Sequence, residues 1–72
     1  MSHKIIRYSK HTIRRKLERN ISEEEIEETI RNPNYVLSSF EERKIAVKQI
    51  AERTIHVIYN EEKTHINIIT VY

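Results

Sequence analysis

The pattern most suggestive of chemistry is a stripe of one histidine and two arginines. His11, Arg15 and Arg19 follow one another at intervals of four residues. On an α-helix this spacing places all three within an arc of about 80°, so they share one face. Guanidinium groups bind phosphate oxygens bidentately, and imidazole exchanges protons near neutral pH. The stripe predicts a phosphate-binding face, and the alternative is that both arginines pair with glutamates of a neighbouring helix.

Two further candidate residues lie at the C-terminus. Thr70 and Tyr72 are two positions apart in an expected strand, so they are predicted to share one face. A hydroxyl and a phenol can hydrogen-bond a phosphate, and a phenol ring can stack on a base. Both residues are also common strand formers, which is the structural alternative. His56 and His65 are lone strand histidines, for which a surface or half-buried structural role is the more common one.

Positive charge is concentrated at the start of the chain. The first 20 residues hold seven Lys or Arg and one Glu, whereas residues 21–31 hold five Glu and one Arg. A local basic segment attracts nucleic-acid phosphates. We therefore expect Lys10 and Arg14 of this segment, together with Lys48 further along the chain, to contact the backbone of a nucleic acid. The alternative is a solvated basic helix that its acidic neighbour neutralises.

The composition excludes several classes of protein. The 72 residues contain no cysteine, no aspartate and no glycine, which excludes disulfides, thiolate zinc sites, a cysteine nucleophile and a glycine-rich phosphate loop. We expect no metal and no cofactor. Because no apolar run approaches the roughly 20 residues of a membrane span and no signal peptide is visible, we expect a cytoplasmic protein without a membrane partner. The length predicts one domain over residues 1–72.

The first predicted helix covers residues 10–19. Ser9 is a favourable N-cap residue at its start. Ile13 and Leu17 are four residues apart and are predicted to form its buried stripe. Because the sequence has no glycine, Asn20 is the candidate for the left-handed residue that ends this helix.

The second predicted helix covers residues 23–31. Ser22 and Glu25 have the spacing of a capping box, and the glutamates of the first turn favour the positive end of the helix dipole. Ile26 and Ile30 form the expected buried face. Pro33 ends the helix, because the residue before a proline avoids the helical conformation.

The other segments are predicted strands, over residues 4–8, 34–40, 43–51, 54–59 and 65–72. The last strand is apolar on both faces, which is typical of the middle of a sheet. Simple alternation places Thr70 and Tyr72 on the same face as Ile66 and Ile68, opposite Val71. The element order is β-α-α-β-β-β-β. It predicts an α+β fold with two helices packed on a four- to five-stranded antiparallel sheet.

Five segments spread over nearly the whole chain form a recognisable series. They are Ser9-Lys10-His11, Arg15, the run from Glu18 to Ile26, Arg31-Asn32-Pro33 and Ile69-Thr70-Val71-Tyr72. This series resembles the small domain-of-unknown-function 4258 family. Members of that family read approximately serine-x-histidine-alanine, arginine, then glutamate-arginine-glycine-isoleucine-serine, and end in a strand similar to valine-isoleucine-threonine-valine-tyrosine. Asn20 stands where the family commonly has glycine, and Lys16 stands where an apolar residue is usual.

That family looks related to the RelE/ParE-like toxins, within the metal-independent ribonuclease folds that include barnase and the colicin nucleases. The resemblance implies RNA, free or ribosome-associated, as target and an antitoxin as partner. The leading hypothesis is a toxin-like endoribonuclease that uses 2′-hydroxyl attack. His11 would transfer the proton, Arg15 and Arg19 would stabilise the developing charge, and Thr70 and Tyr72 would position the substrate. Because ParE-like members are not ribonucleases, the alternative is a non-catalytic RNA- or protein-binding module.

Overall fold

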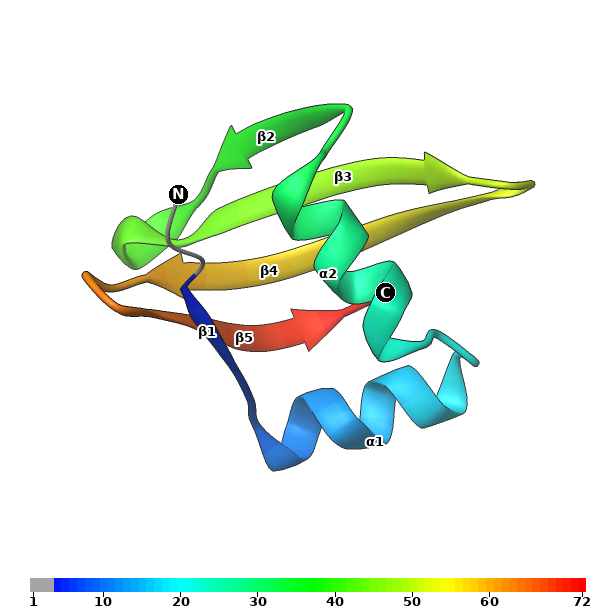
Figure 1. Ribbon diagram of the computed structural model, residues 1–72, viewed down its shortest axis with the longest axis horizontal. Helices are drawn as coiled ribbons and strands as arrows, with labels where there is room; N and C mark the ends of the chain where they lie inside the picture. Colours follow the sequence, from blue (N-terminus) through cyan, green and yellow to red (C-terminus); the bar gives the residue numbers. More distant parts are fainter. Residues whose placement is uncertain (1–3) are drawn as a thin grey trace.

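Five strands form one mixed sheet, with one helix across its face and another along one edge (Figure 1). The structure is a computed structural model that describes residues 4–72. Its elements are β1 (Ile5–Tyr8), α1 (Lys10–Glu18), α2 (Glu23–Arg31), β2 (Tyr35–Ser38), a short 3₁₀ turn (Phe40–Glu42), β3 (Lys44–Ile50), β4 (Arg53–Glu61) and β5 (His65–Val71). The predicted order of helices and strands is confirmed, and each boundary lies within two residues of the one predicted.

The sheet is mixed, so the prediction of an antiparallel sheet is wrong. The strand order is β1-β5-β4-β3-β2, and β1 runs parallel to β5 while every other neighbouring pair is antiparallel. Short connections fix the alternating directions of β2 to β5. The two helices separate β1 from these strands, and a connection of that length permits parallel pairing. The prediction that the last strand is central is confirmed, since β5 lies between β1 and β4.

A bulge in β5 changes which of its side chains share a face. Val71 and Ile68 pair with two β4 residues that are only two positions apart, so β5 has one extra residue between these pairs. Val71 therefore lies on the core face together with Ile68, whereas Thr70 and Tyr72 lie on the opposite face. The predicted alternation is wrong here, because it assumed a regular strand.

The hydrophobic core lies between α2 and the sheet. Its buried residues are Ile21, Ile26, Ala46, Ile55, Val57, Tyr59, Ile66, Ile68 and Val71. The predicted burial of Ile26 on the inner face of α2 is confirmed. The other sheet face is not covered by either helix in the described chain (Figure 1).

Helix α1 does not pack through the predicted apolar stripe. Ile13 is 43% exposed and Leu17 is 70% exposed, whereas Thr12 is fully buried. The Thr12 hydroxyl donates to the Ile68 carbonyl oxygen at 3.1 Å. That carbonyl lies where β1 ends, so the helix supplies a hydrogen bond in place of a neighbouring strand. A polar contact at a sheet edge, rather than apolar burial, therefore orients α1.

The end of α1 confirms Asn20 as a left-handed residue. Asn20 has a φ of 55°, its N–H donates to the Leu17 oxygen at 3.2 Å, and the Ile21 N–H donates to the Lys16 oxygen at 2.8 Å. This pair of bonds is the Schellman motif, which satisfies carbonyl groups at a helix end. Asparagine tolerates this conformation better than most residues, so it replaces the missing glycine.

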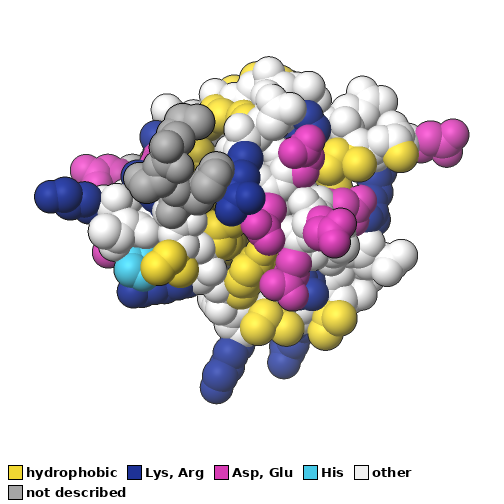
Figure 2. Space-filling view, viewed as in Figure 1, with side chains coloured by type: hydrophobic (Ala, Val, Ile, Leu, Met, Phe, Trp, Pro, Cys, Tyr) yellow, Lys and Arg dark blue, Asp and Glu magenta, His cyan; other side chains and the backbone are white. Residues whose placement is uncertain are grey.

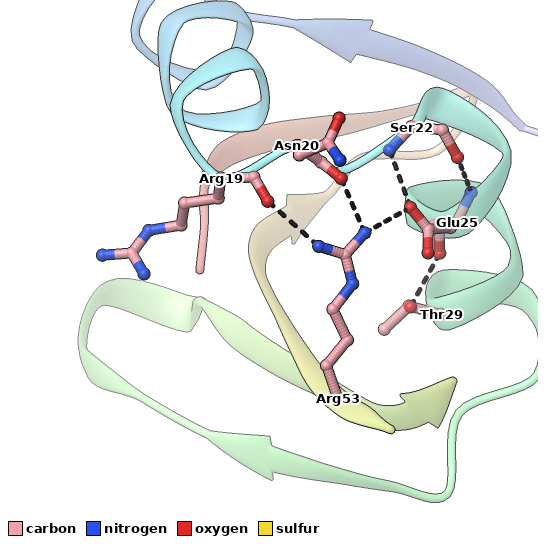
Figure 3. Close-up of polar contacts among 6 residues, drawn as sticks. All are labelled: Arg19, Asn20, Ser22, Glu25, Thr29 and Arg53. Atoms are coloured by element: carbon pink, nitrogen blue, oxygen red, sulfur yellow. Dashed lines mark hydrogen bonds and ion pairs between the residues drawn. The ribbon is translucent and has the colours of Figure 1, made fainter. Parts of the chain in front are cut away.

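The connection between the helices is tied to β4 by one arginine (Figure 3). Ser22 and Glu25 form the predicted capping box, with bonds of 2.9 and 3.1 Å. Arg53 donates to Glu25 Oε1 at 2.7 Å and to the backbone oxygens of Arg19 and Asn20 at 3.0 and 2.7 Å. The hydrogen bond from the Ser22 backbone N–H lowers the pKa of the Glu25 carboxyl most, and the hydrogen bond from Arg53 lowers it further. These bonds attach the connection between α1 and α2 to the start of β4.

Ser22→Ala should lower the free energy of unfolding by about 0.5–2 kcal/mol, because the first turn of α2 loses its side-chain cap. A thermal melt measures the effect, and any activity of the folded protein should stay unchanged. Ser39→Ala is a matched control, since Ser39 precedes the 3₁₀ turn without a side-chain capping bond. Equal melting temperatures for Ser22→Ala and the parent protein would contradict the role of this cap.

Candidate functional site

A cleft of about 260 Å³ lies between α1 and the C-terminal end of β5. It is lined by His11, Arg15, Arg19, Thr70, Val71 and Tyr72. Within the described residues β1 pairs with β5 only as far as Ile68, so α1 lies beside the end of β5. The structure thus brings the five residues predicted as catalytic around one cleft, together with Val71.

Helix α1 supplies the positive wall of the cleft. Thr12 and Lys16 turn toward the protein, with Thr12 fully buried and the Lys16 side chain 16% exposed. Because residues four positions apart share a helix face, His11, Arg15 and Arg19 lie along the adjoining side. His11 and Arg19 are exposed and Arg15 is half-buried. The Thr12 contact with β5 therefore aims the stripe at the cleft.

Strand β5 supplies the opposite wall. The bulge places Thr70 and Tyr72 on the uncovered face of the sheet, where Tyr72 meets His56 of β4. Their rings stack with centroids 4.6 Å apart and planes 5° apart. His56 Nδ1 is buried and has no hydrogen-bond partner within residues 4–72. From the sequence His56 is a lone strand histidine, because only the strand register reveals its contact with Tyr72.

The arginines of the cleft are not neutralised by α2. Arg15 Nη1 lies 3.8 Å from Glu18 Oε1 of the same helix, an exposed contact that contributes little. Within the part of the chain that the structure describes, Arg19 has no ion pair of 4 Å or less. The α1–α2 ion pair in that part joins Lys16 and Glu23 at 3.9 Å. The alternative in which both arginines pair with the second helix is therefore wrong.

The three residues predicted to contact the RNA backbone have different positions. Lys10 and Arg14 are exposed on α1 and enlarge the positive surface beside the cleft. Figure 2 shows basic side chains projecting near α1 and acidic side chains gathered over α2. Lys48 lies on β3 and its Nζ donates to the Asn32 carbonyl oxygen at 2.7 Å. It does not line the cleft, so RNA contact at Lys48 stays a prediction from the sequence.

A second hollow of about 210 Å³ on α2 is lined by Glu24, Glu27, Glu28 and Arg31. Its carboxylates repel phosphate, which leaves the first cleft as the candidate anion site. Residues 4–72 contain no group of three or more His or Glu placed to hold a metal ion. Over the same residues, no helix has the length and apolar character needed to cross a membrane.

The cleft combines the groups that phosphate chemistry requires. Two guanidinium groups can hold and stabilise phosphate oxygens, and the hydroxyls of Thr70 and Tyr72 can donate hydrogen bonds. Among the lining residues, His11 is the imidazole, the side chain that most often transfers protons in catalysis. The arrangement can bind a phosphodiester and move one proton beside it.

Comparison with known proteins identifies a family to which the chain is similar. The model of a family described as a domain of unknown function, DUF4258, matches residues 8–72 and so includes both walls of the cleft. Neither the curated proteins nor the solved structures compared with the chain gave a match.

Proposed function

The chain belongs to the DUF4258 family, and we propose that this member binds RNA in the cleft and cleaves it as a toxin-like, metal-independent endoribonuclease. The observation that carries the proposal is the convergence of His11, Arg15 and Arg19 with two hydroxyl groups of β5 around one cleft. The lining includes no carboxylate. The phosphate charge would therefore be balanced by guanidinium groups.

The proposed reaction is an internal transfer at phosphorus. The neutral imidazole of His11 accepts the proton of an RNA 2′-hydroxyl, and the 2′-oxygen forms a bond to the adjacent phosphorus. The bond from phosphorus to the 5′-oxygen breaks, that oxygen takes a proton from water, and the hydroxide left behind removes the proton that His11 accepted. The products are a 2′,3′-cyclic phosphate and a free 5′-hydroxyl. Arg15 and Arg19 stabilise the negative charge that develops on the phosphoryl oxygens.

The fold supports a relation to the RelE/ParE-like toxins as part of this proposal. The pair of helices beside a sheet is what such a relation implies, whereas the parallel pairing of β1 with β5 departs from the antiparallel sheet that it implies. Because one fold can host many unrelated activities, the proposed function rests on the residues of the cleft and not on the fold. A toxin of this kind would have an antitoxin as its protein partner.

A non-catalytic RNA-binding module is the second candidate function. The supply of proton-transfer groups favours it, because His11 is the one imidazole among the residues that line the cleft. The His56 ring lies behind Tyr72. Two arginines and two hydroxyls suffice for binding without proton transfer. Incubation of the purified protein with RNA, followed by analysis for cyclic-phosphate ends, separates the two functions.

Binding of single-stranded RNA should weaken steeply as salt concentration rises, because the cleft arginines displace counterions from phosphates. The logarithm of the binding constant should fall linearly with the logarithm of salt concentration. Arg15→Ala and Arg19→Ala should each reduce the slope by about 0.7. Arg43→Ala is the control, since Arg43 follows the 3₁₀ turn and does not line the cleft. Salt-independent binding would remove the basis for a phosphate-binding cleft.

A further inference from the structure

The stacked pair of Tyr72 and His56 gives the cleft an aromatic wall. We propose that the free ring face of Tyr72 stacks on an unpaired nucleobase next to the phosphate bound by Arg15 and Arg19, so that the cleft selects single-stranded RNA. This inference rests on the proposed function, because it concerns the same cleft. It adds a base-binding subsite and assigns His56 as a positioning residue.

The backbone fixes the stacked pair. The His56 N–H donates to the Tyr72 oxygen at 2.8 Å, and the Tyr72 N–H donates to the His56 oxygen at 2.9 Å. The two side chains are therefore direct cross-strand neighbours, and their rings stack almost in parallel. His56 covers one face of the Tyr72 ring. The ring is thus held in place before a ligand arrives, which reduces the ordering cost of binding.

The second face of the Tyr72 ring is turned toward the cleft. β4 lies on one side of β5, and α1 lies on the other side beyond the end of β1. Tyr72 lines the cleft opposite the arginines and remains 42% exposed. A flat ring beside two guanidinium groups matches the two parts of a nucleotide, a base and its phosphate.

The bulge is what makes this wall available. In a regular strand, Tyr72 would lie on the same face as Ile68 and would be directed into the core side of the sheet. The extra residue turns Thr70 and Tyr72 to the opposite face while Val71 stays fully buried. Bulges frequently redirect side chains beside functional sites, and here the redirected residues are those that line the cleft.

Stacking on an aromatic ring tolerates any base, because every base has a π-face. It does not tolerate a base that is already paired and stacked in a duplex. The cleft should therefore distinguish single strands from duplexes, with little preference among sequences. Phosphate contacts alone would give no such distinction at equal charge.

The test measures binding of three 2′-O-methylated, non-cleavable probes of equal charge: a single-stranded hexanucleotide, the same backbone with abasic sites, and a blunt duplex matched for total charge. The wild-type protein should bind the single strand at least about 10-fold more tightly than either of the others. Tyr72→Leu should bind all three alike, whereas Tyr72→Phe should retain the preference. Tyr35→Leu is the matched control, since Tyr35 is 53% exposed on the far edge strand β2.

Two further variants test the role of His56. They also test the stacking subsite in the event that Tyr72→Leu does not fold. His56→Ala should reduce the preference for the single strand, and His56→Phe should restore it by restoring an aromatic support for Tyr72. A merely structural role for His56 would change stability without changing the ratio between probes. The ratio of the affinities for the single-stranded and abasic probes is therefore the measurement that distinguishes a positioning role of His56 from a merely structural one.

The outcomes separate this inference from the proposed function. If Tyr72→Leu keeps the wild-type preference, or Tyr35→Leu loses it equally, the stacking subsite is wrong while salt-dependent binding at the arginines can still stand. If wild-type protein binds the abasic probe as tightly as the single strand, the subsite is also wrong. If the wild-type protein binds none of the probes at low salt, both the function and the subsite are wrong.

Discussion

His11→Ala should slow RNA cleavage about 10²–10⁴-fold, because the variant loses the group that accepts the 2′-hydroxyl proton. Its melting temperature should stay close to that of the parent protein, since His11 is exposed and Thr12 holds α1 to β5. RNA binding should largely persist through Arg15 and Arg19. The assay follows cleavage of single-stranded and ribosome-bound RNA by purified protein and identifies cyclic-phosphate ends.

His65→Ala is the matched control for this experiment. His65 lies at the opposite end of β5 from the cleft, where it contacts Arg7 and Thr64. Its replacement should leave the cleavage rate unchanged. If wild-type protein freed of any partner cleaves neither substrate, the binding module replaces the enzyme as the function. If His11→Ala cleaves as fast as wild type, another group transfers the proton, and His56 is the next residue to replace.

Ile26→Ala should lower the free energy of unfolding by about 2–5 kcal/mol, because it leaves a cavity where α2 packs on the sheet. Small domains bury a limited core and have little stability to spare, so a fraction of the variant should be unfolded at room temperature. Urea denaturation followed by circular dichroism measures the change. RNA binding should fall in proportion to the folded fraction.

Ile13→Ala makes the same chemical change in the other helix. Ile13 is 43% exposed, so its replacement should change stability by no more than about 0.5 kcal/mol. The two variants together test which residues attach the helices to the sheet. Equal destabilisation by both would mean that α1 packs through the apolar stripe read from the sequence, and that Thr12 does not set its orientation.

The features that the sequence predicted well are local ones. The capping box of Ser22 and Glu25 and the left-handed Asn20 depend on residues within one or two turns of each other. The same holds for the stripe on α1, since helical spacing alone places His11 beside Arg15. Local rules therefore gave both helices and one wall of the cleft.

The features that the sequence did not predict depend on contacts between distant segments. The parallel pairing of β1, the bulge in β5 and the stacking of His56 on Tyr72 each require the strand register. Tyr72 was selected on the assumption of a regular strand that would have placed it on the other face. The strands predicted over residues 43–51 and 54–59 leave residues 52–53 as the turn, whereas β3 ends at Ile50 and β4 begins at Arg53. The turn begins one residue earlier because Ala51 adopts a φ of 57°, which is uncommon for alanine.

The pairing of β1 with β5 has a consequence for the order of events during synthesis. The hydrogen bond of Thr12 in α1 reaches Ile68, which lies 56 positions further along the chain, and the far wall of the cleft, Thr70 to Tyr72, follows Ile68. A ribosome therefore releases β1 and α1 well before the strand against which they fold. Contacts this distant in sequence form late. A nascent chain would carry the arginine stripe without the cleft, and the RNA site would be completed only once β5 has been translated.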